Sequence, residues 1–221
     1  MDQISQGFAR DDLFVIERSC KMHGGNINST CFSSQGGLLG SGGQDQQVVV
    51  WNLAENCRAS AFHRHKAEVT CVKFTPDGSK IASSSYDGTV KLWVPKILSK
   101  CISLNAHTYC VRDIDFSYDG KLLLTASDDK TLKIWSMPKQ RFLTSFSGHV
   151  NWIRSCQFSP DSRLIVSAGD ERQIKIWNTD DNSCIRNIHT QQSQITSVTF
   201  DVSGNAIASS SVDGTVHIWD I

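Results

Sequence analysis

A tryptophan recurs along this chain at a constant interval of 42 residues, at Trp51, Trp93, Trp135, Trp177 and Trp219. Three other residue types keep that interval: a phenylalanine 19 residues before each tryptophan, an acid six before it and, in four cases, a histidine 28 before it. These columns are Phe32, Phe74, Phe116, Phe158 and Phe200; Asp45, Asp87, Asp129, Glu171 and Asp213; and His23, His65, His107 and His149, with Gln191 in the fifth histidine place. Four columns in one register indicate five copies of one structural unit. We place the repeats at about 13–53, 54–95, 96–137, 138–179 and 180–221, after a leader over residues 1–12.

Each repeat has the pattern of several short β-strands. In the second repeat, Val69–Phe74, Lys80–Ser85 and Thr89–Trp93 are rich in β-branched and small residues, and Asp-Gly pairs between them supply the positive φ of tight hairpin turns. A further strand, such as Cys101–Leu104, follows each tryptophan. Helical repeats are excluded because no 3.6-residue periodicity is present. Four strands in about 42 residues predict an all-β propeller of five four-stranded blades.

Closure of the propeller depends on the strand at the start of the first repeat. Leu13–Arg18 reads as a strand without the other three strands of its own blade, while the fifth repeat has three strands and no fourth. If Leu13–Arg18 pairs beside Thr215–Trp219, it completes the fifth blade and closes a ring without exposed edges. Otherwise the chain forms an open five-blade arc whose end blades expose apolar faces and recruit another chain. We favour closure of the ring.

The composition excludes several functional classes. Lysine plus arginine and aspartate plus glutamate number 22 each, so the formal net charge of zero argues against nucleic-acid or acidic-membrane binding through bulk charge. No apolar run has the length of a membrane span, and Met1–Ile4 does not begin a signal peptide. The eight cysteines have no zinc-ligand spacing, and Cys31, Cys71 and Cys156 are expected to be buried thiols. We expect a soluble intracellular protein without a metal or cofactor.

Two local patterns resemble ligand sites but lack essential parts. The glycine-rich stretch Ser33–Gly43 has neither the Gly-Lys-Ser/Thr ending nor the following helix of a phosphate-binding loop. The cluster His63–Lys66 has no carboxylate or cysteine at metal-ligand spacing. We therefore expect neither a nucleotide nor a metal ion at these places.

A histidine, a serine and an aspartate recur together and could suggest a catalytic triad. With the tryptophan they form the sets His65, Ser85, Asp87, Trp93 and His107, Ser127, Asp129, Trp135. A catalytic site needs one well-placed copy, so repetition of the set argues for a structural role and against an enzyme. The serine column holds Gly43 and Gly169 in the first and fourth repeats, and the fifth repeat has Gln191 for histidine, with His189 nearby as a substitute. We expect the second and third blades to be the stiffest.

The residues Gly148-His149, Ile176-Trp177-Asn178 and the pair Trp219-Asp220 resemble WD repeats, and the match covers residues 13–221. Within it, the runs that begin at Trp93-Val-Pro-Lys, Ala106-His-Thr and His149-Val-Asn-Trp-Ile-Arg are similar to the centriolar WD-repeat family called proteome of centriole protein 1. That resemblance implies a non-enzymatic component of centrioles and basal bodies that helps stabilise microtubule walls and supports cilium formation. It also implies that each histidine bridges the turn aspartate and the strand serine, whose other partner is the indole N–H. That family has seven repeats, whereas five are present here.

The resemblance further implies that partners bind to the loops beside the histidine and the turn acid. The candidate partner-binding residues there, called the candidate rim below, are Tyr86, Arg112, Asp128, Trp152, Arg154 and Asp170. Trp152 is the sixth tryptophan and lies outside the repeat register. Aromatic residues and arginine together are enriched in interface hot spots. The alternative is a solvated surface with one packed indole, in which the two aspartates simply pair with the two arginines.

These observations predict a cytoskeletal scaffold in the cytoplasm, located at the centriole or ciliary basal body. Its partners are expected to be proteins, namely tubulin or other centriolar components, with no nucleic acid, membrane or small-molecule substrate. The leading alternative is a generic WD-repeat adaptor in signalling or a ubiquitin-ligase substrate receptor. A propeller hydrolase is the weakest alternative, because nearly every histidine and turn aspartate belongs to a repeated column.

Overall fold

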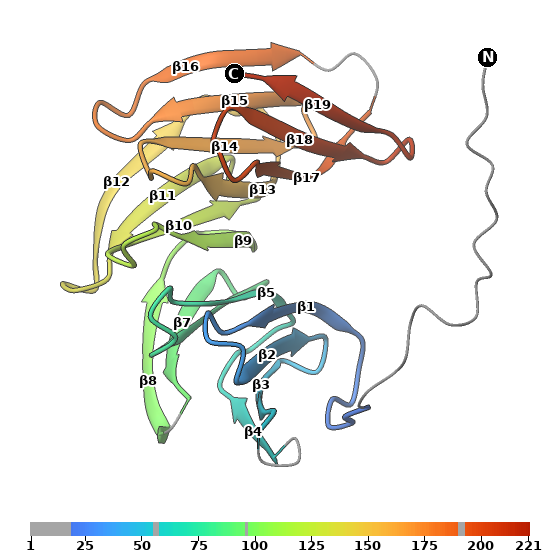
Figure 1. The fold of residues 1–221 in the computed structure, drawn as a ribbon, viewed down its shortest axis with the longest axis vertical. Coiled ribbons are helices and arrows are strands. Elements are labelled where there is room, and N and C mark those ends of the chain that lie inside the picture. The colour runs from blue at the N-terminus through green and yellow to red at the C-terminus, as the bar shows by residue number, and fades with distance from the viewer. Residues whose placement is uncertain (1–18, 55–57, 96, 190–192) are drawn as a thin grey trace.

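The computed structural model of the protein describes residues 19–54, 58–95, 97–189 and 193–221, which form nineteen strands in five antiparallel sheets (Figure 1). Blade one contains β1 (Ile27–Phe32), β2 (Leu38–Gly43), β3 (Gln47–Asn52) and β4 (Arg58–His63); blade two contains β5 (Val69–Phe74), β6 (Ile81–Ser85), β7 (Thr89–Val94) and β8 (Ile97–Asn105). Blade three contains β9 (Val111–Phe116), β10 (Leu122–Ser127), β11 (Thr131–Ser136) and β12 (Arg141–Ser147); blade four contains β13 (Ile153–Phe158), β14 (Leu164–Gly169), β15 (Gln173–Asn178) and β16 (Cys184–His189). Blade five contains β17 (Ile195–Phe200), β18 (Ala206–Ser211) and β19 (Val216–Asp220). The predicted all-β, five-blade propeller architecture is confirmed.

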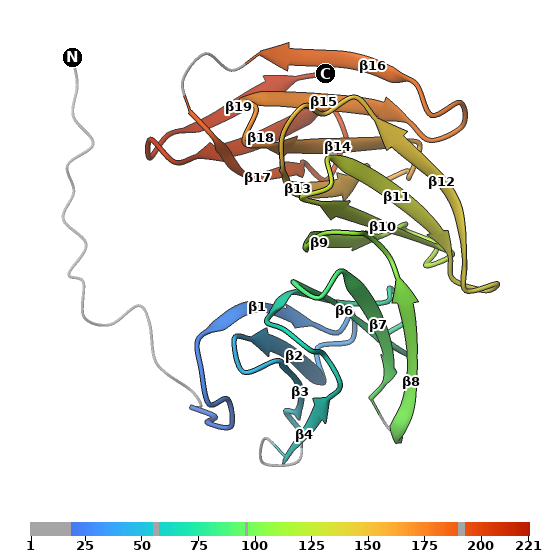
Figure 2. The same cartoon turned by 180° about the vertical axis from the view of Figure 1, so that it is seen from behind.

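The blades follow one another in sequence order around an arc. The first strand of each blade lies innermost and contacts the first strand of the next, in the order β1, β5, β9, β13, β17. Figures 1 and 2 show blade one and blade five at opposite ends of this arc. The described residues therefore form the open five-blade arc, and the closed ring that the sequence favoured is not present among them. The described part of blade five is a three-stranded sheet. The strand predicted over Leu13–Arg18 lies outside the described residues.

The outermost strand of each four-stranded blade comes from the following sequence repeat. For example, β4 (Arg58–His63) pairs with β3 of blade one but lies within the predicted second repeat, 54–95. Each repeat therefore links two adjacent blades covalently. The described part of the chain contains no helix with the length and hydrophobicity that a membrane crossing requires.

The hydrophobic core consists of four layers, one between each pair of adjacent blades. Between blades one and two, Val48, Val50 and Phe62 pack against Val72 and Trp93, all of them buried. The rings of Phe62 and Trp93 have centroids 5.1 Å apart, within the range of favourable aromatic pairs. Burying these side chains stabilises each junction by about 1.5–3 kcal/mol per large apolar residue. The repeated tryptophans and phenylalanines of blades two to five take part in these layers, whereas Phe32 of blade one is exposed.

A tight turn joins the second and third strands of each blade, as the Asp-Gly pairs predict. Gly88 has a φ of 78°, and a Cβ built on it would lie 2.7 Å from the carbonyl oxygen of His107. Glycine meets both requirements because it has no Cβ. Lys130 adopts the same left-handed conformation, with a φ of 70°, in blade three. Blade three therefore retains the tight turn although Lys130 stands in place of the glycine.

Two aspartates of β9 bind the backbone of the next blade. Oδ2 of Asp113 accepts a hydrogen bond from the N–H of Cys156, and Oδ2 of Asp115 accepts one from the N–H of Phe158, each at 3.0 Å. The ammonium of Lys73, from blade two, lies 3.8 Å from Oδ1 of Asp115. Asp115 therefore joins three successive blades on the inner wall of the arc.

Asp115 predicts a stability that changes with pH. Burial raises the pKa of Asp115 to about 6, although Lys73 and the N–H of Phe158 oppose that rise. An unfolded aspartate titrates near pH 4, so between about pH 4 and pH 6 the folded chain holds a proton that the unfolded chain has lost. The contribution of this group to stability therefore declines as pH rises through that window.

The variant Asp115→Asn keeps an oxygen acceptor for the N–H of Phe158 and removes this titration. We expect urea unfolding of the variant to show a flatter dependence of stability on pH between about pH 4.5 and pH 7. Asp119→Asn is the control, because its side chain is about half exposed and its low pKa lies outside this window. Parallel pH profiles for Asp115→Asn and the unmodified chain would contradict the assignment.

Candidate protein-interaction surface

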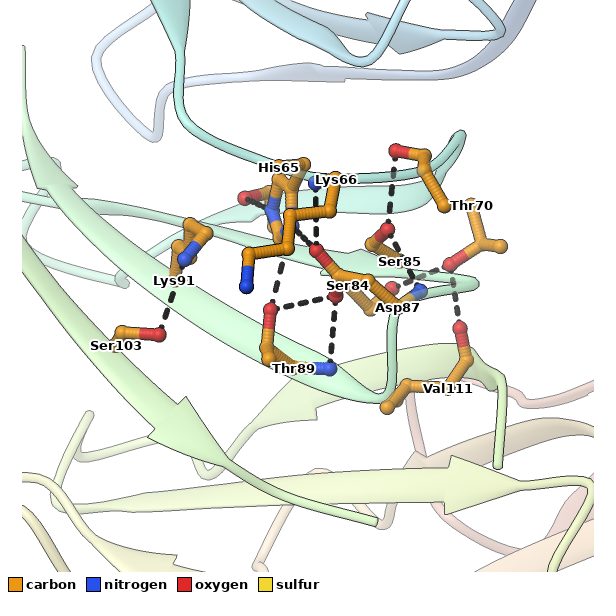
Figure 3. A network of polar contacts seen from close by, with 12 residues as sticks. His65, Lys66, Thr70, Ser84, Ser85, Asp87, Thr89, Lys91, Ser103 and Val111 are labelled. Carbon is orange, nitrogen blue, oxygen red and sulfur yellow. Dashed lines mark hydrogen bonds and ion pairs between the residues drawn. The ribbon is translucent and has the colours of Figure 1, made fainter. Parts of the chain in front are cut away.

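A four-residue hydrogen-bond network lies at one end of blade two, the end that carries the β6–β7 turn and the loop before β5. Nδ1 of His65 lies 3.1 Å from Oδ2 of Asp87, and Nε2 of His65 lies 2.7 Å from Oγ of Ser83. The indole N–H of Trp93 donates to the same serine oxygen at 2.8 Å. Asp87 also accepts from the backbone N–H of Lys66 at 2.9 Å, as Figure 3 shows. The network therefore ties the loop before β5 to the strands and the turn.

The serine predicted for this network was wrong by two positions. Ser85 lies at the end of β6, where its hydroxyl donates to the carbonyl of Ala67 and accepts from the N–H of Asp87, both at 3.1 Å. Because Trp93 pairs with Ile81 across the two strands, its indole N–H reaches Ser83 and not the strand end.

The same correction applies to blade three. Ser127 accepts from the N–H of Asp129 at 3.0 Å, whereas the hydroxyl between His107 and Trp135 belongs to Thr125. Ser127 therefore caps the turn and is not part of the four-residue network, which is called the tetrad below.

When the hydroxyl is taken two positions earlier in each repeat, blades one and four also have complete networks. Blade one uses Ser41 and blade four uses Ser167, so the expectation that these blades lack the hydroxyl was wrong. The four tetrads are His23, Asp45, Ser41, Trp51; His65, Asp87, Ser83, Trp93; His107, Asp129, Thr125, Trp135; and His149, Glu171, Ser167, Trp177. In blade five the indole of Trp219 donates to Ser209 at 2.9 Å. Gln191 lies outside the described residues, and His189 is exposed at the end of β16, paired with Gln173 of blade four.

The histidine and the acid of each tetrad are buried or nearly buried. Burial lowers the pKa of His107, although the carboxylate of Asp129 partly opposes this effect. Burial acts in the opposite direction on Asp129, but hydrogen bonds from His107 and Thr131 outweigh it and lower its pKa to about 2. The carboxylates are thus ionised and hydrogen-bonded, which fits a structural lock between loop and strand.

The loops at the same end of the five blades surround one cavity of about 520 Å³. Its lining comes from all five blades and includes Asn28, Tyr86, Arg112, Arg154 and Val212. These residues belong to the columns beside the histidine and the turn acid from which the candidate rim was predicted. Columns that lie 42 residues apart in the sequence are therefore brought together at the inner mouth of the arc.

Arg112 is the centre of the candidate rim. Its guanidinium donates two hydrogen bonds to Asp128, Nε to Oδ1 at 2.8 Å and Nη2 to Oδ2 at 2.7 Å. A third N–H donates to the hydroxyl of Tyr86, whose ring centroid lies 4.7 Å from the guanidinium carbon. Arg112 thus connects blade three to blade two while one face of the guanidinium lies over an aromatic ring.

Trp152 lies near both arginines of the candidate rim. Its ring is 5.7 Å from the guanidinium carbon of Arg112 and 5.4 Å from that of Arg154. Arg154 in turn donates two hydrogen bonds to Asp170, at 2.7 and 2.9 Å. The aspartates pair with the arginines as expected, yet Trp152 stays 43% exposed and Tyr86 45% exposed. The result is a fixed cluster that presents two aromatic surfaces to solvent.

Sequence reasoning missed two exposed residues on neighbouring loops. Tyr109 is 66% exposed in the loop between β8 and β9, and Val150 is 69% exposed between β12 and β13. Each follows the tetrad histidine of its repeat by one or two residues. The signal in the sequence was a large apolar residue where the other repeats have Gly, Ala, Lys, Asn, Gln, Ser or Thr. They extend the apolar surface beyond the candidate rim.

The described cysteines are free thiols. Cys71 and Cys156 are buried as expected, whereas Cys31 is only partly buried. Burial also raises the pKa of Cys110, below the candidate rim, to about 12, so this thiol is protonated at neutral pH. In the parts of the chain that the structure describes, no group of three or more His, Cys, Asp or Glu residues could hold a metal ion.

No curated protein sequence matches this chain significantly. The family described as WD domain, G-beta repeat (WD40) matches residues 14–52, 56–94, 98–136, 140–178 and 182–220. Each match ends within one residue of a repeated tryptophan. With five matched repeats, five antiparallel sheets and four tetrads, the chain belongs to the WD40 repeat family.

Proposed function

We propose that this chain is a non-enzymatic protein-interaction scaffold of centrioles and basal bodies, which binds tubulin or other centriolar proteins through the candidate rim. WD40 domains generally bind other proteins, so a scaffold or adaptor role follows from the family. The centriolar assignment and the cytoskeletal location are supported by the sequence motifs around Trp93, Ala106 and His149.

The observation that carries the proposal is the Tyr86–Arg112–Trp152–Arg154 cluster. Both arginines are held by bidentate aspartate pairs, so a partner would meet side chains that are already positioned. Rigid aromatic and arginine residues lose little conformational entropy on binding and are enriched among hot spots. The apolar residues Tyr109 and Val150 enlarge the exposed surface next to this cluster.

A non-enzymatic role is supported by the use of the histidines. In blades one to four, Nδ1 of each histidine donates to a tetrad carboxylate, and Nε2 is hydrogen-bonded to a tetrad hydroxyl beneath the surface. A hydroxyl that must also bind an indole N–H is poorly placed to act as a nucleophile. These sets are therefore interpreted as supports for the loops that carry the candidate rim.

The function is tested by the location of the tagged chain in ciliated cells. We expect the unmodified chain to form centriolar foci, and we expect the double variant Tyr86→Ala, Trp152→Ala to reduce the foci about tenfold or more, as loss of a hot spot does. The double variant leaves both arginine–aspartate pairs intact, so the fold is kept. Tyr118→Ala is the matched control, because Tyr118 is 81% exposed in the β9–β10 turn, at the other end of the blades.

Each result has a distinct meaning. Diffuse staining of the unmodified chain would contradict the centriolar assignment and favour a signalling adaptor or ubiquitin-ligase receptor. Foci that persist in the double variant would place the interface outside the candidate rim.

A further inference from the structure

Every blade has a front face and a rear face, and each internal junction packs the front face of one blade on the rear face of the next. The front face carries two apolar residues of the third strand: Val48 and Val50, Val90 and Leu92, Leu132 and Ile134, Ile174 and Ile176. The rear face carries two residues of the first strand: Val69 and Phe74, Val111 and Phe116, Ile153 and Phe158, Ile195 and Phe200. These front-face residues are at most 4% exposed and these rear-face residues at most 8%.

The same positions are exposed at the two ends of the arc. In the front face of blade five, Val216 is 68% exposed and Ile218 is 76% exposed. In the rear face of blade one, Ile27 is 51% exposed and Phe32 is 64% exposed. The two ends of the arc therefore expose one front face and one rear face, the same two kinds of face that pack together at each of the four internal junctions.

The internal junctions hold these two halves apart. Nδ2 of Asn28 donates to the carbonyl of Val69 at 2.9 Å. Oγ1 of Thr70 donates to the carbonyl of Val111 in the same way, and Figure 3 shows this second bond. Such bonds between innermost strands, together with the packed layers between sheets, set the angle from one blade to the next. Bringing the two ends of one chain together would require the angle at one or more of these junctions to change.

We propose that the front face of blade five docks on the rear face of blade one of a second copy of this chain. The second copy carries the surface that fits, because each internal junction pairs the same two columns of residues. The contact is head-to-tail, so an open assembly keeps one free face of each kind and can add further copies until its rotation closes a ring. The proposal stands independently of the centriolar function.

Two variants that each disable one face test the proposal. Phe32→Lys places a charge on the rear face of blade one, and Ile218→Lys places one on the front face of blade five. Both side chains are mostly exposed in the single chain, so we expect each variant to fold, with a far-ultraviolet circular dichroism spectrum like that of the unmodified chain. Leu143→Lys is the matched control, because Leu143 is 43% exposed on the outer strand β12.

The measurement is molar mass by light scattering over a range of protein concentrations. We expect the mass of the unmodified chain and of Leu143→Lys to rise with concentration to at least twice that of one chain, whereas each face variant alone stays monomeric. Mixed in equal amounts, the face variants should form a dimer and nothing larger, since only one intact pair of faces remains. A monomeric unmodified chain, a face variant that associates with itself, or a mixture that stays monomeric would overturn the proposal.

Discussion

Ser83→Ala is expected to lower the free energy of unfolding by about 2–4 kcal/mol, because it leaves two polar groups without a partner in a buried site. Ser83 is fully buried, and its hydroxyl binds both Nε2 of His65 and the indole N–H of Trp93. Each unsatisfied buried group costs about 1–3 kcal/mol. Urea unfolding followed by tryptophan fluorescence measures the loss.

Ser85→Ala is the matched control, two residues away on the same strand. Its hydroxyl binds only backbone groups at the strand end, and the equivalent places in blades one and four are Gly43 and Gly169. We expect a cost of about 1 kcal/mol. A larger loss for Ser85→Ala than for Ser83→Ala would contradict the corrected position of the tetrad hydroxyl.

Gly169→Ala is expected to destabilise the chain by about 3 kcal/mol or more, because the added methyl group meets backbone that cannot move independently. A Cβ at Gly169 would lie 1.9 Å from the carbonyl oxygen of Trp152 and 2.9 Å from Cα of Ile153. Relief of this clash must displace β13 at the point where Trp152 enters the candidate rim. We therefore expect a change in Trp152 fluorescence together with the loss of stability.

Gly37→Ala provides the comparison, since a Cβ there would have no neighbour within 4 Å and the backbone is not left-handed. Its effect should stay within about 0.5 kcal/mol. A cost below about 1 kcal/mol for Gly169→Ala would show that blade four can adopt the backbone that accommodates Ser85. That result would contradict the steric argument.

The repeat columns predicted most of the fold. A tryptophan, a phenylalanine and a turn acid that recur every 42 residues have few structural explanations, and each occupies the same place in its blade. The position of the tetrad hydroxyl could not be predicted in the same way. Ser83, Ser84 and Ser85 are adjacent, and Thr125 stands where the second blade has Ser83, so only the pairing of β6 with β7 distinguishes them.

The repeat columns predicted which residues form the candidate rim, but they did not predict the contacts between those residues. Its positions follow from the loops beside the histidine and the acid, but the stacking of Arg112 on Tyr86 joins two blades and depends on the distance between them. Whether blades one and five meet in a closed ring depends on the angle between adjacent blades, and no repeated residue position predicts that angle. The sequence therefore left exposed end faces as the alternative to a closed ring, and the exposure of Phe32 and Ile218 in the structure favours that alternative.

The central claim is that the candidate rim holds the partner, and photo-crosslinking from position 152 tests it most directly. A photoreactive amino acid replaces Trp152 in one variant and Tyr118 in another, and each is irradiated in ciliated cells. We predict adducts with tubulin or a centriolar protein from position 152 and none from position 118. Adducts from position 118 alone, or from neither position while the chain remains at centrioles, would contradict the claim.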